Sequence, residues 1–151
     1  MSYSASYFGP LASGPATSLA ADYTNAEGST IPFCTPVSSN TSGNIVFTDV
    51  TSEANIQAFV GLTTVSLAPA ALGLVISDGR LTNIPSALGF TIGQAIYLGN
   101  IPGTLTNIKP DSTISGWNPG DWVVLVGVVL KNQQNSLNQD IQLFRQIIGQ
   151  L

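Results

Sequence analysis

Short apolar runs separated by Gly, Pro, Asn and Asp recur along the chain from residue 44 onward. β-branched residues (Val, Ile and Thr) are abundant in these runs, and they favour pleated, half-buried strands. Short strands joined by frequent turns are typical of β-sandwiches and β-barrels. The pattern therefore predicts an all-β fold, either a small antiparallel β-barrel or a β-sandwich.

Seven strands can be placed from the runs, and three dipeptides mark turns between them. Asp78-Gly79 predicts a tight hairpin, and Pro102-Gly103 and Pro119-Gly120 predict type II turns. The last run is almost wholly apolar, which predicts a central strand buried on both faces. The expected strands are 45–50, 57–62, 73–77, 80–84, 94–98, 104–108 and 122–130.

The segment 140–151 fits two patterns. Ile141 and Leu143 alternate as in a strand, whereas Ile141, Phe144 and Ile148 also fit helical spacing. We favour a strand, because residues 135–139 have the composition of a loop and the surrounding segments are β.

Residues 1–43 differ from the β domain expected over 44–151. They are rich in Ser, Ala, Thr, Gly and Pro, with Tyr3, Tyr7 and Phe8 as isolated aromatic points. One interpretation is a poorly ordered terminus. The other is an extended N-terminal arm that becomes ordered along a neighbouring subunit, with these three aromatic residues as its contacts.

Two stretches of the chain nearly repeat each other at an offset of 24 residues. Residues 79–85 read GRLTNIP, and residues 103–110 read GTLTNIKP. Each copy is followed by a loop and a Gly-led apolar strand. Two copies are too few for a solenoid, so we expect two similar β-hairpins facing each other in one small barrel or sandwich.

Composition excludes several classes of function. Only 8% of residues are charged, there is no histidine, and Cys34 is the single cysteine. Histidine acid–base chemistry, His–Cys metal sites and intrachain disulfides are therefore excluded, and we expect no cofactor and no metal. Cys34 has no basic neighbour in the sequence, which favours a buried, inert thiol.

The charge balance also limits the partners. Four scattered basic residues cannot neutralise a run of phosphates or an anionic membrane surface, so we expect neither nucleic acid nor membrane as a partner. Nor does the start of the chain resemble a signal peptide. Charge is depleted in the cores of subunit interfaces, so the low charge predicts a homo-oligomer or an assembled coat.

Two candidate sites remain after these exclusions. Eight carboxylates are the remaining acid–base groups, but most lie beside turn residues, where Asp is common, so we do not expect an enzyme. Trp117 lies in a loop near Trp122 and Tyr97, where its ring is either an exposed platform for a sugar or a cap on the core or on a subunit contact.

A series of core and turn motifs runs through residues 56–130: Val60-Gly61, GLVISDGRL at 73–81, GQAIYL at 93–98, PGTLT at 102–106 and GDWVVLVG at 120–127. The order of these motifs resembles small structural proteins of tailed bacteriophages, which decorate or cement the capsid or form head fibres. The resemblance implies a non-enzymatic virion protein, made in the host cytoplasm, that forms a trimer and binds the major capsid protein or another virion protein. A tail-fibre or receptor-binding module that recognises surface glycans is the alternative.

Overall fold

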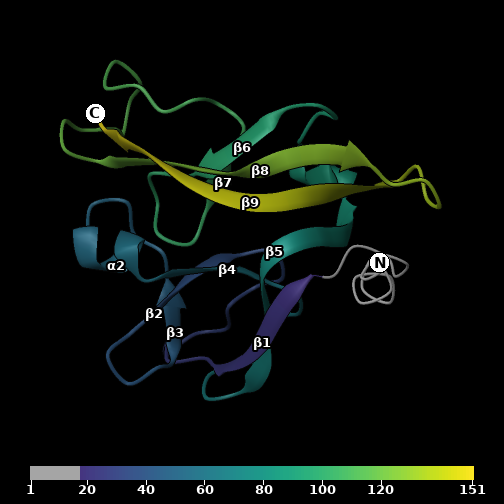
Figure 1. The fold of residues 1–151 in the computed structure, drawn as a ribbon, viewed down its shortest axis with the longest axis horizontal. Helices are drawn as coiled ribbons and strands as arrows, with labels where there is room; N and C mark the ends of the chain where they lie inside the picture. The colour runs from purple at the N-terminus through teal and green to yellow at the C-terminus, as the bar shows by residue number, and fades with distance from the viewer. Residues whose placement is uncertain (1–17) are drawn as a thin grey trace, which may run out of the picture.

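The apolar runs form antiparallel strands of one curled, barrel-like sheet, which confirms the all-β prediction. The computed structural model describes residues 18–151 (Figure 1). The strands are β1 (Leu19–Thr24), β2 (Pro36–Ser39), β3 (Ile45–Phe47), β4 (Phe59–Thr63), β5 (Leu72–Pro85), β6 (Ala95–Leu98), β7 (Leu105–Thr106), β8 (Trp122–Lys131) and β9 (Asn138–Gln150). Two short helices, α2 (Glu53–Gln57) and the 3₁₀ turn η1 (Ser86–Leu88), join them.

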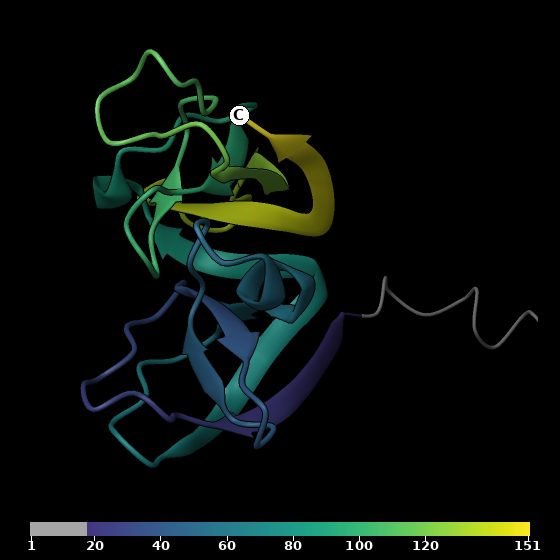
Figure 2. The ribbon, with the colours of Figure 1, turned by 90° about the vertical axis from the view of Figure 1, so that its left-hand side faces the viewer.

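The sheet has two halves that share β5. Its order is β3-β2-β4-β5-β9-β8-β6-β7, and β1 pairs with the first half of β5. In Figure 2, β1 to β4 lie in the lower half and β6 to β9 in the upper half, with β5 running through both. At the end of β1, Asn25 bridges Ile45 of β3, so the lower half curls around a small core of Ile31, Val37, Ile45, Leu67 and Val75.

The strand β5 passes through Asp78-Gly79 without reversing, so the predicted hairpin turn is wrong. Before this point β5 pairs with β1 and β4, and from Gly79 onward it pairs with β9. Gly79 has a φ of 109°, and a Cβ there would lie 2.7 Å from the Cα of Ser18. A glycine is needed because two backbones meet at a bend.

The upper half curls around the main core. Its centre includes Leu98, Val126, Ile141 and Leu143, all at most 1% exposed. β8 lies between β6 and β9, which confirms the predicted central strand. β9 confirms the strand favoured for residues 140–151, although it begins at Asn138, two residues inside the expected loop.

Two further local predictions have opposite outcomes. The type II turns are confirmed: the amide of Thr104 donates to the carbonyl of Ile101, and that of Asp121 to the carbonyl of Asn118, both at 3.1 Å. The strand expected from residue 57 begins later, because Ser52 caps the helix α2 by accepting a hydrogen bond from the amide of Asn55.

The internal repeat does not form two hairpins. The first copy spans the end of β5 and β6, and the second spans β7 and β8. Neither pair of strands is adjacent, because the order is β5-β9-β8-β6-β7. The two copies interlock instead, since β6 of the first copy pairs with both strands of the second.

The arm predicted over residues 1–43 is wrong for residues 19–43. These residues contribute β1 and β2, and Ile31 and Val37 are fully buried. The composition did not indicate these strands, because β1 is largely exposed and β2 contains only four residues, two of them serines. The β domain therefore begins by Leu19, whereas residues 1–17 lie outside the described part of the chain.

Candidate functional site

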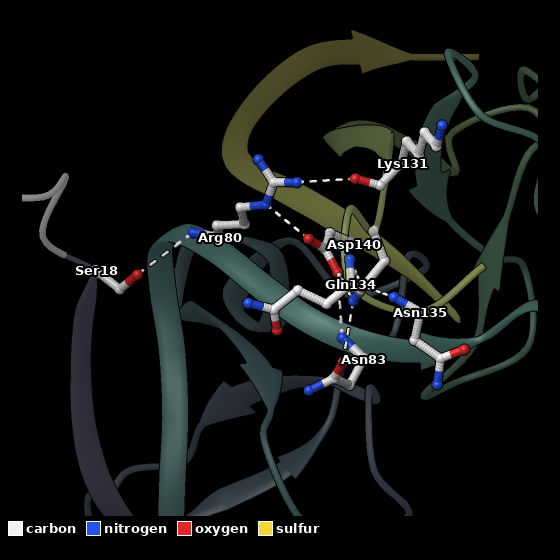
Figure 3. Close-up of polar contacts among 8 residues, drawn as sticks. Ser18, Arg80, Asn83, Lys131, Gln134, Asn135 and Asp140 are labelled. Atoms are coloured by element: carbon white, nitrogen blue, oxygen red, sulfur yellow. Dashed lines mark hydrogen bonds and ion pairs between the residues drawn. The ribbon is translucent and has the colours of Figure 1, made fainter. Parts of the chain in front are cut away.

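A cluster of polar side chains lies where β5 crosses from the lower half to the upper half (Figure 3). At its centre is Asp140 of β9, whose side chain is only 5% exposed. One carboxylate oxygen accepts a hydrogen bond from Nε of Arg80 in β5 at 2.7 Å. The guanidinium, which is 43% exposed, also donates to the carbonyl of Lys131 at 3.0 Å. This ion pair fastens β5 to the β8–β9 hairpin.

The other oxygen of Asp140 binds two donors that come from different elements. It accepts from the amide of Asn83 at 3.2 Å and from the side-chain amide of Asn132 at 3.0 Å. Asn83 has a φ of 62°, a left-handed conformation that asparagine tolerates better than most residues. The buried carboxylate is therefore fully bonded within the protein.

Asn132 links this cluster to the loop between β8 and β9. Its side-chain oxygen accepts from the amides of Gln134 and Asn135 at 2.9 and 2.8 Å, which is the usual way an asparagine fixes a turn. Its amide also donates to the side-chain oxygen of Asn83 at 3.0 Å. One side chain thus fixes both the loop and the bend of β5.

The cluster lies beside an open pocket of about 310 Å³. The pocket is lined by Arg80, Thr82, Asn83, Asn132, Gln133, Gln134 and Asp140. Asp140 is the only carboxylate among the lining residues, so the pocket contains no pair of acids for general acid–base catalysis. What it offers is hydrogen-bonding amides and an exposed guanidinium. We interpret the cluster as a structural junction between the two halves of the sheet.

The sequence contains no local signal for this cluster. Arg80 and Asp140 lie 60 positions apart, and the internal repeat that contains Arg80 and Asn83 does not include Asn132 or Asp140. Only the pairing of β5 with β9 brings them together.

The residues proposed from the sequence as contacts have different outcomes. Tyr3, Tyr7 and Phe8 lie outside the described residues. Trp117 is 8% exposed and packs in the main core, so its ring caps the core and offers no exposed platform for a sugar. Burial raises the pKa of the Cys34 thiol to about 12, which confirms the inert thiol.

Many large apolar side chains are exposed on the described surface, a feature that the sequence analysis missed. Three of them, Phe144, Ile147 and Ile148, follow one another closely in β9 and are 38–50% exposed. Their positions continue the apolar pattern of the buried part of β9, so the sequence could not show where burial ends. The others are Leu19, Val65, Leu72, Leu74, Leu88, Ile92, Ile101, Ile108 and Leu137.

The exposed part of β9 also has an edge with which no strand within residues 18–151 pairs. From Asn138 to Leu143, β9 lies between β5 and β8, but β5 bends away at Gly79. Beyond Leu143, β9 pairs only with β8 among the described strands. Its other edge faces an open pocket of about 280 Å³ against α2 and β4, where Arg145 donates a hydrogen bond to the carbonyl of Phe59.

Two other features are absent from residues 18–151. No three His, Cys, Asp or Glu side chains in this range lie close enough together to hold a metal ion. In the same range, no helix is long and apolar enough to cross a membrane.

Comparison with known proteins adds no relative. No protein-family model matches the chain, and no curated protein matches it either.

Proposed function

We propose that this chain is a non-enzymatic structural protein of a bacteriophage particle, which self-associates and binds the protein shell as a decoration or cement protein. The observation that carries the proposal is the exposed apolar surface, above all Phe144, Ile147 and Ile148 beside an edge of β9 with which no described strand pairs. The motif order over residues 56–130, which resembles phage decoration proteins, supplies the type of particle.

Physical chemistry supports burial of this surface by a partner. Clustered exposed apolar residues are uncommon on soluble monomers and mark interaction sites. A sparsely charged surface favours burial in an interface, because removing charged groups from water costs free energy. A standard interface covers about 800 Å² per partner, roughly a tenth of the 7978 Å² that the described chain exposes.

The alternative is a module that recognises surface glycans. Trp117, the ring expected to stack on a sugar, is buried, so it does not support this alternative. The absence of histidine and of a second carboxylate in the polar pocket also supports a role without catalysis.

The mass of the full chain in solution tests self-association. Native mass spectrometry is expected to give a multiple of the 15.7 kDa chain mass, with a trimer as the expected form. Phe144→Asp is expected to shift the distribution towards the monomer, whereas the control Leu137→Asp, at an exposed residue in the β8–β9 loop, leaves it unchanged. A full chain that stays monomeric at micromolar concentration contradicts the proposal.

A sedimentation assay tests binding to the shell. The purified chain is expected to sediment with capsids of the virus that encodes it and to remain in the supernatant without them. Failure to sediment with capsids refutes the role on the shell, even if the chain forms an oligomer.

A further inference from the structure

We propose that the open pocket beside the polar cluster binds a neutral saccharide. Such binding is a second activity, independent of the self-association and the shell binding proposed above. Four features support it: a bulge in β5 at the pocket, polar groups without partners among residues 18–151, hydrogen bonds that hold two of these groups in place, and an adjoining apolar wall.

The strand β5 bulges where it borders the pocket. Three steps along β5, from Leu81 to Ile84, match only two steps along β9. Thr82 and Asn83 lie within this bulge, both are exposed, and both line the pocket. Asn83 also has a φ of 62°. Bulges and left-handed residues other than glycine are common at binding sites, where they direct side chains towards a ligand.

The pocket is lined by polar groups that have no hydrogen-bond partner among residues 18–151. They are Nη1 of Arg80, the hydroxyl of Thr82, Nδ2 of Asn83 and the side-chain amides of Gln133 and Gln134. In Figure 3, the side chain of Gln134 extends over β5 between Arg80 and Asn83. Because amides and hydroxyls both donate and accept, these groups match the hydroxyls of a sugar.

The buried cluster holds two of these groups in place from behind. Arg80 donates to Asp140 through Nε and to the carbonyl of Lys131 through Nη2, which leaves Nη1 for a ligand. The side-chain oxygen of Asn83 accepts from Asn132 at 3.0 Å, which leaves Nδ2 for a ligand. Groups that are fixed before binding lose less conformational entropy when they bind. The cluster therefore supports a ligand as well as joining the two halves of the sheet.

The charge of the pocket favours a neutral ligand over an anion. Among the described residues that line it, only Arg80 and Asp140 are charged, and they form an ion pair with 2.7 Å between Nε and Oδ2. An anion on the guanidinium would lie near the Asp140 carboxylate, and like charges repel. A neutral sugar avoids this cost, because its hydroxyls bind guanidinium and amide groups without bringing a charge.

A second pocket adds an apolar wall. It measures about 450 Å³ and shares Arg80, Thr82 and Asn83 with the first pocket, so the two adjoin. Its lining includes the buried side chain of Leu81 and the half-buried ring of Phe33. A sugar ring combines hydroxyls at its edge with C–H groups on its face, and the C–H groups pack against apolar side chains.

The size of the first pocket suits one sugar ring. Ligand pockets measure roughly 300–1,000 Å³, and this pocket, at about 310 Å³, lies at the lower end of that range. One ring has about 12 non-hydrogen atoms, for which the binding efficiency of ordinary ligands gives a dissociation constant of about 2 mM. Tighter binding requires several sites at once, as a polysaccharide on an oligomer would provide.

An NMR titration of the ¹⁵N-labelled full chain tests the proposal. The probes are the methyl glycosides of glucose, galactose, mannose and N-acetylglucosamine. At least one of them is expected to shift the side-chain amide signals of Asn83, Gln133 and Gln134, with saturation in the low millimolar range. No shift of these signals with any probe at about 50 mM, well above the expected dissociation constant, overturns the proposal. So does a probe that shifts only signals elsewhere in the chain.

A double variant tests whether the pocket itself binds the sugar. Thr82→Val/Gln134→Ala removes two side-chain groups that bond to no other residue among 18–151, so we expect the fold to persist and the affinity to fall at least tenfold. The matched control Thr30→Val/Gln57→Ala changes the same residue types at exposed positions outside both pockets and is expected to bind as the wild type does. Equal affinity of the pocket variant and the wild type overturns the proposal.

An acidic sugar tests the preference for a neutral ligand. The methyl glycoside of glucuronic acid has the ring of glucose with an added carboxylate, and it is expected to bind more weakly than the best neutral probe. If it binds more tightly than every neutral probe, the pocket is an anion site and the proposal is wrong. These outcomes are separate from the mass and the sedimentation of the chain, so failure here leaves the proposed function standing.

Discussion

Replacing Asp140 with alanine is expected to destabilise the protein more than any other single change in the polar cluster. The carboxylate is 5% exposed and joins three elements through Arg80, Asn83 and Asn132. Alanine removes all three acceptor contacts at once. Because the site is buried, water replaces them poorly, so the remaining donors lose their partner.

The expected magnitude follows from the exposure of each partner. Arg80 is 43% exposed, so its guanidinium regains water and its ion pair contributes only about 0–1 kcal/mol. Asn83 is also exposed, so its amide regains water and the lost hydrogen bond costs about 0.5–1.5 kcal/mol at most. Asn132 is 6% exposed. Its side-chain amide keeps its bond to Asn83 but loses Asp140 as its second acceptor, and such a buried donor costs about 1–3 kcal/mol. Together these terms predict a loss of about 2–3 kcal/mol in the free energy of unfolding.

Urea unfolding followed by circular dichroism measures this loss, with protein concentration held constant because assembly shifts apparent stability. Since 1 kcal/mol moves the melting temperature of a domain of this size by about 2–4 °C, we expect a drop of roughly 5–10 °C. Arg80→Lys is the matched control: it keeps a positive charge beside the buried carboxylate and should lose less than about 1 kcal/mol. If Arg80→Lys destabilises the protein as much as Asp140→Ala, burial of the carboxylate is not the source of its effect.

Three further predictions concern buried positions. Gly127→Ala is expected to lower stability by about 3 kcal/mol or more, because its Cβ would overlap the backbone carbonyl of Gln142; wild-type stability in urea unfolding would contradict the packing. Leu143→Ala, at a fully buried position, should lose about 2–5 kcal/mol in the same assay, and a loss below 1 kcal/mol would be inconsistent with a core position. Burial raises the pKa of the Cys34 thiol from its ordinary 9.0 to about 12, so its contribution to stability is complete below pH 9 and falls by about 1.4 kcal/mol per pH unit from there towards pH 12. Unfolding at pH 8 and pH 10.5 measures that fall, and Cys34→Ser should lack it.

Local features of the fold were predictable from the sequence. The nearly all-apolar run at 122–130 forms the central strand β8, and the two Pro-Gly turns form where expected. These predictions depend only on neighbouring residues, because proline sets φ and glycine accepts a positive φ. The all-β class followed from the same local signals.

Non-local features were not predictable in this way. Asp78-Gly79 has the composition of a hairpin, yet the approach of Ser18 makes it a bend within one strand. The contact of Arg80 with Asp140 depends on the same bend. Such features arise from strands that pair across 60 or so positions, and no window of the sequence contains both partners.

The shared strand β5 also determines the order in which the sheet can assemble. Its first half pairs with β1 and β4, which precede it in the chain, whereas its second half pairs with β9, the last of the described strands. β9 also lies between β5 and β8, so the upper half of the sheet cannot close until that strand has been synthesised. Non-local pairing of this kind slows folding to milliseconds or seconds. During that interval the second half of β5 is itself an unpaired edge, which is open to pairing with another chain.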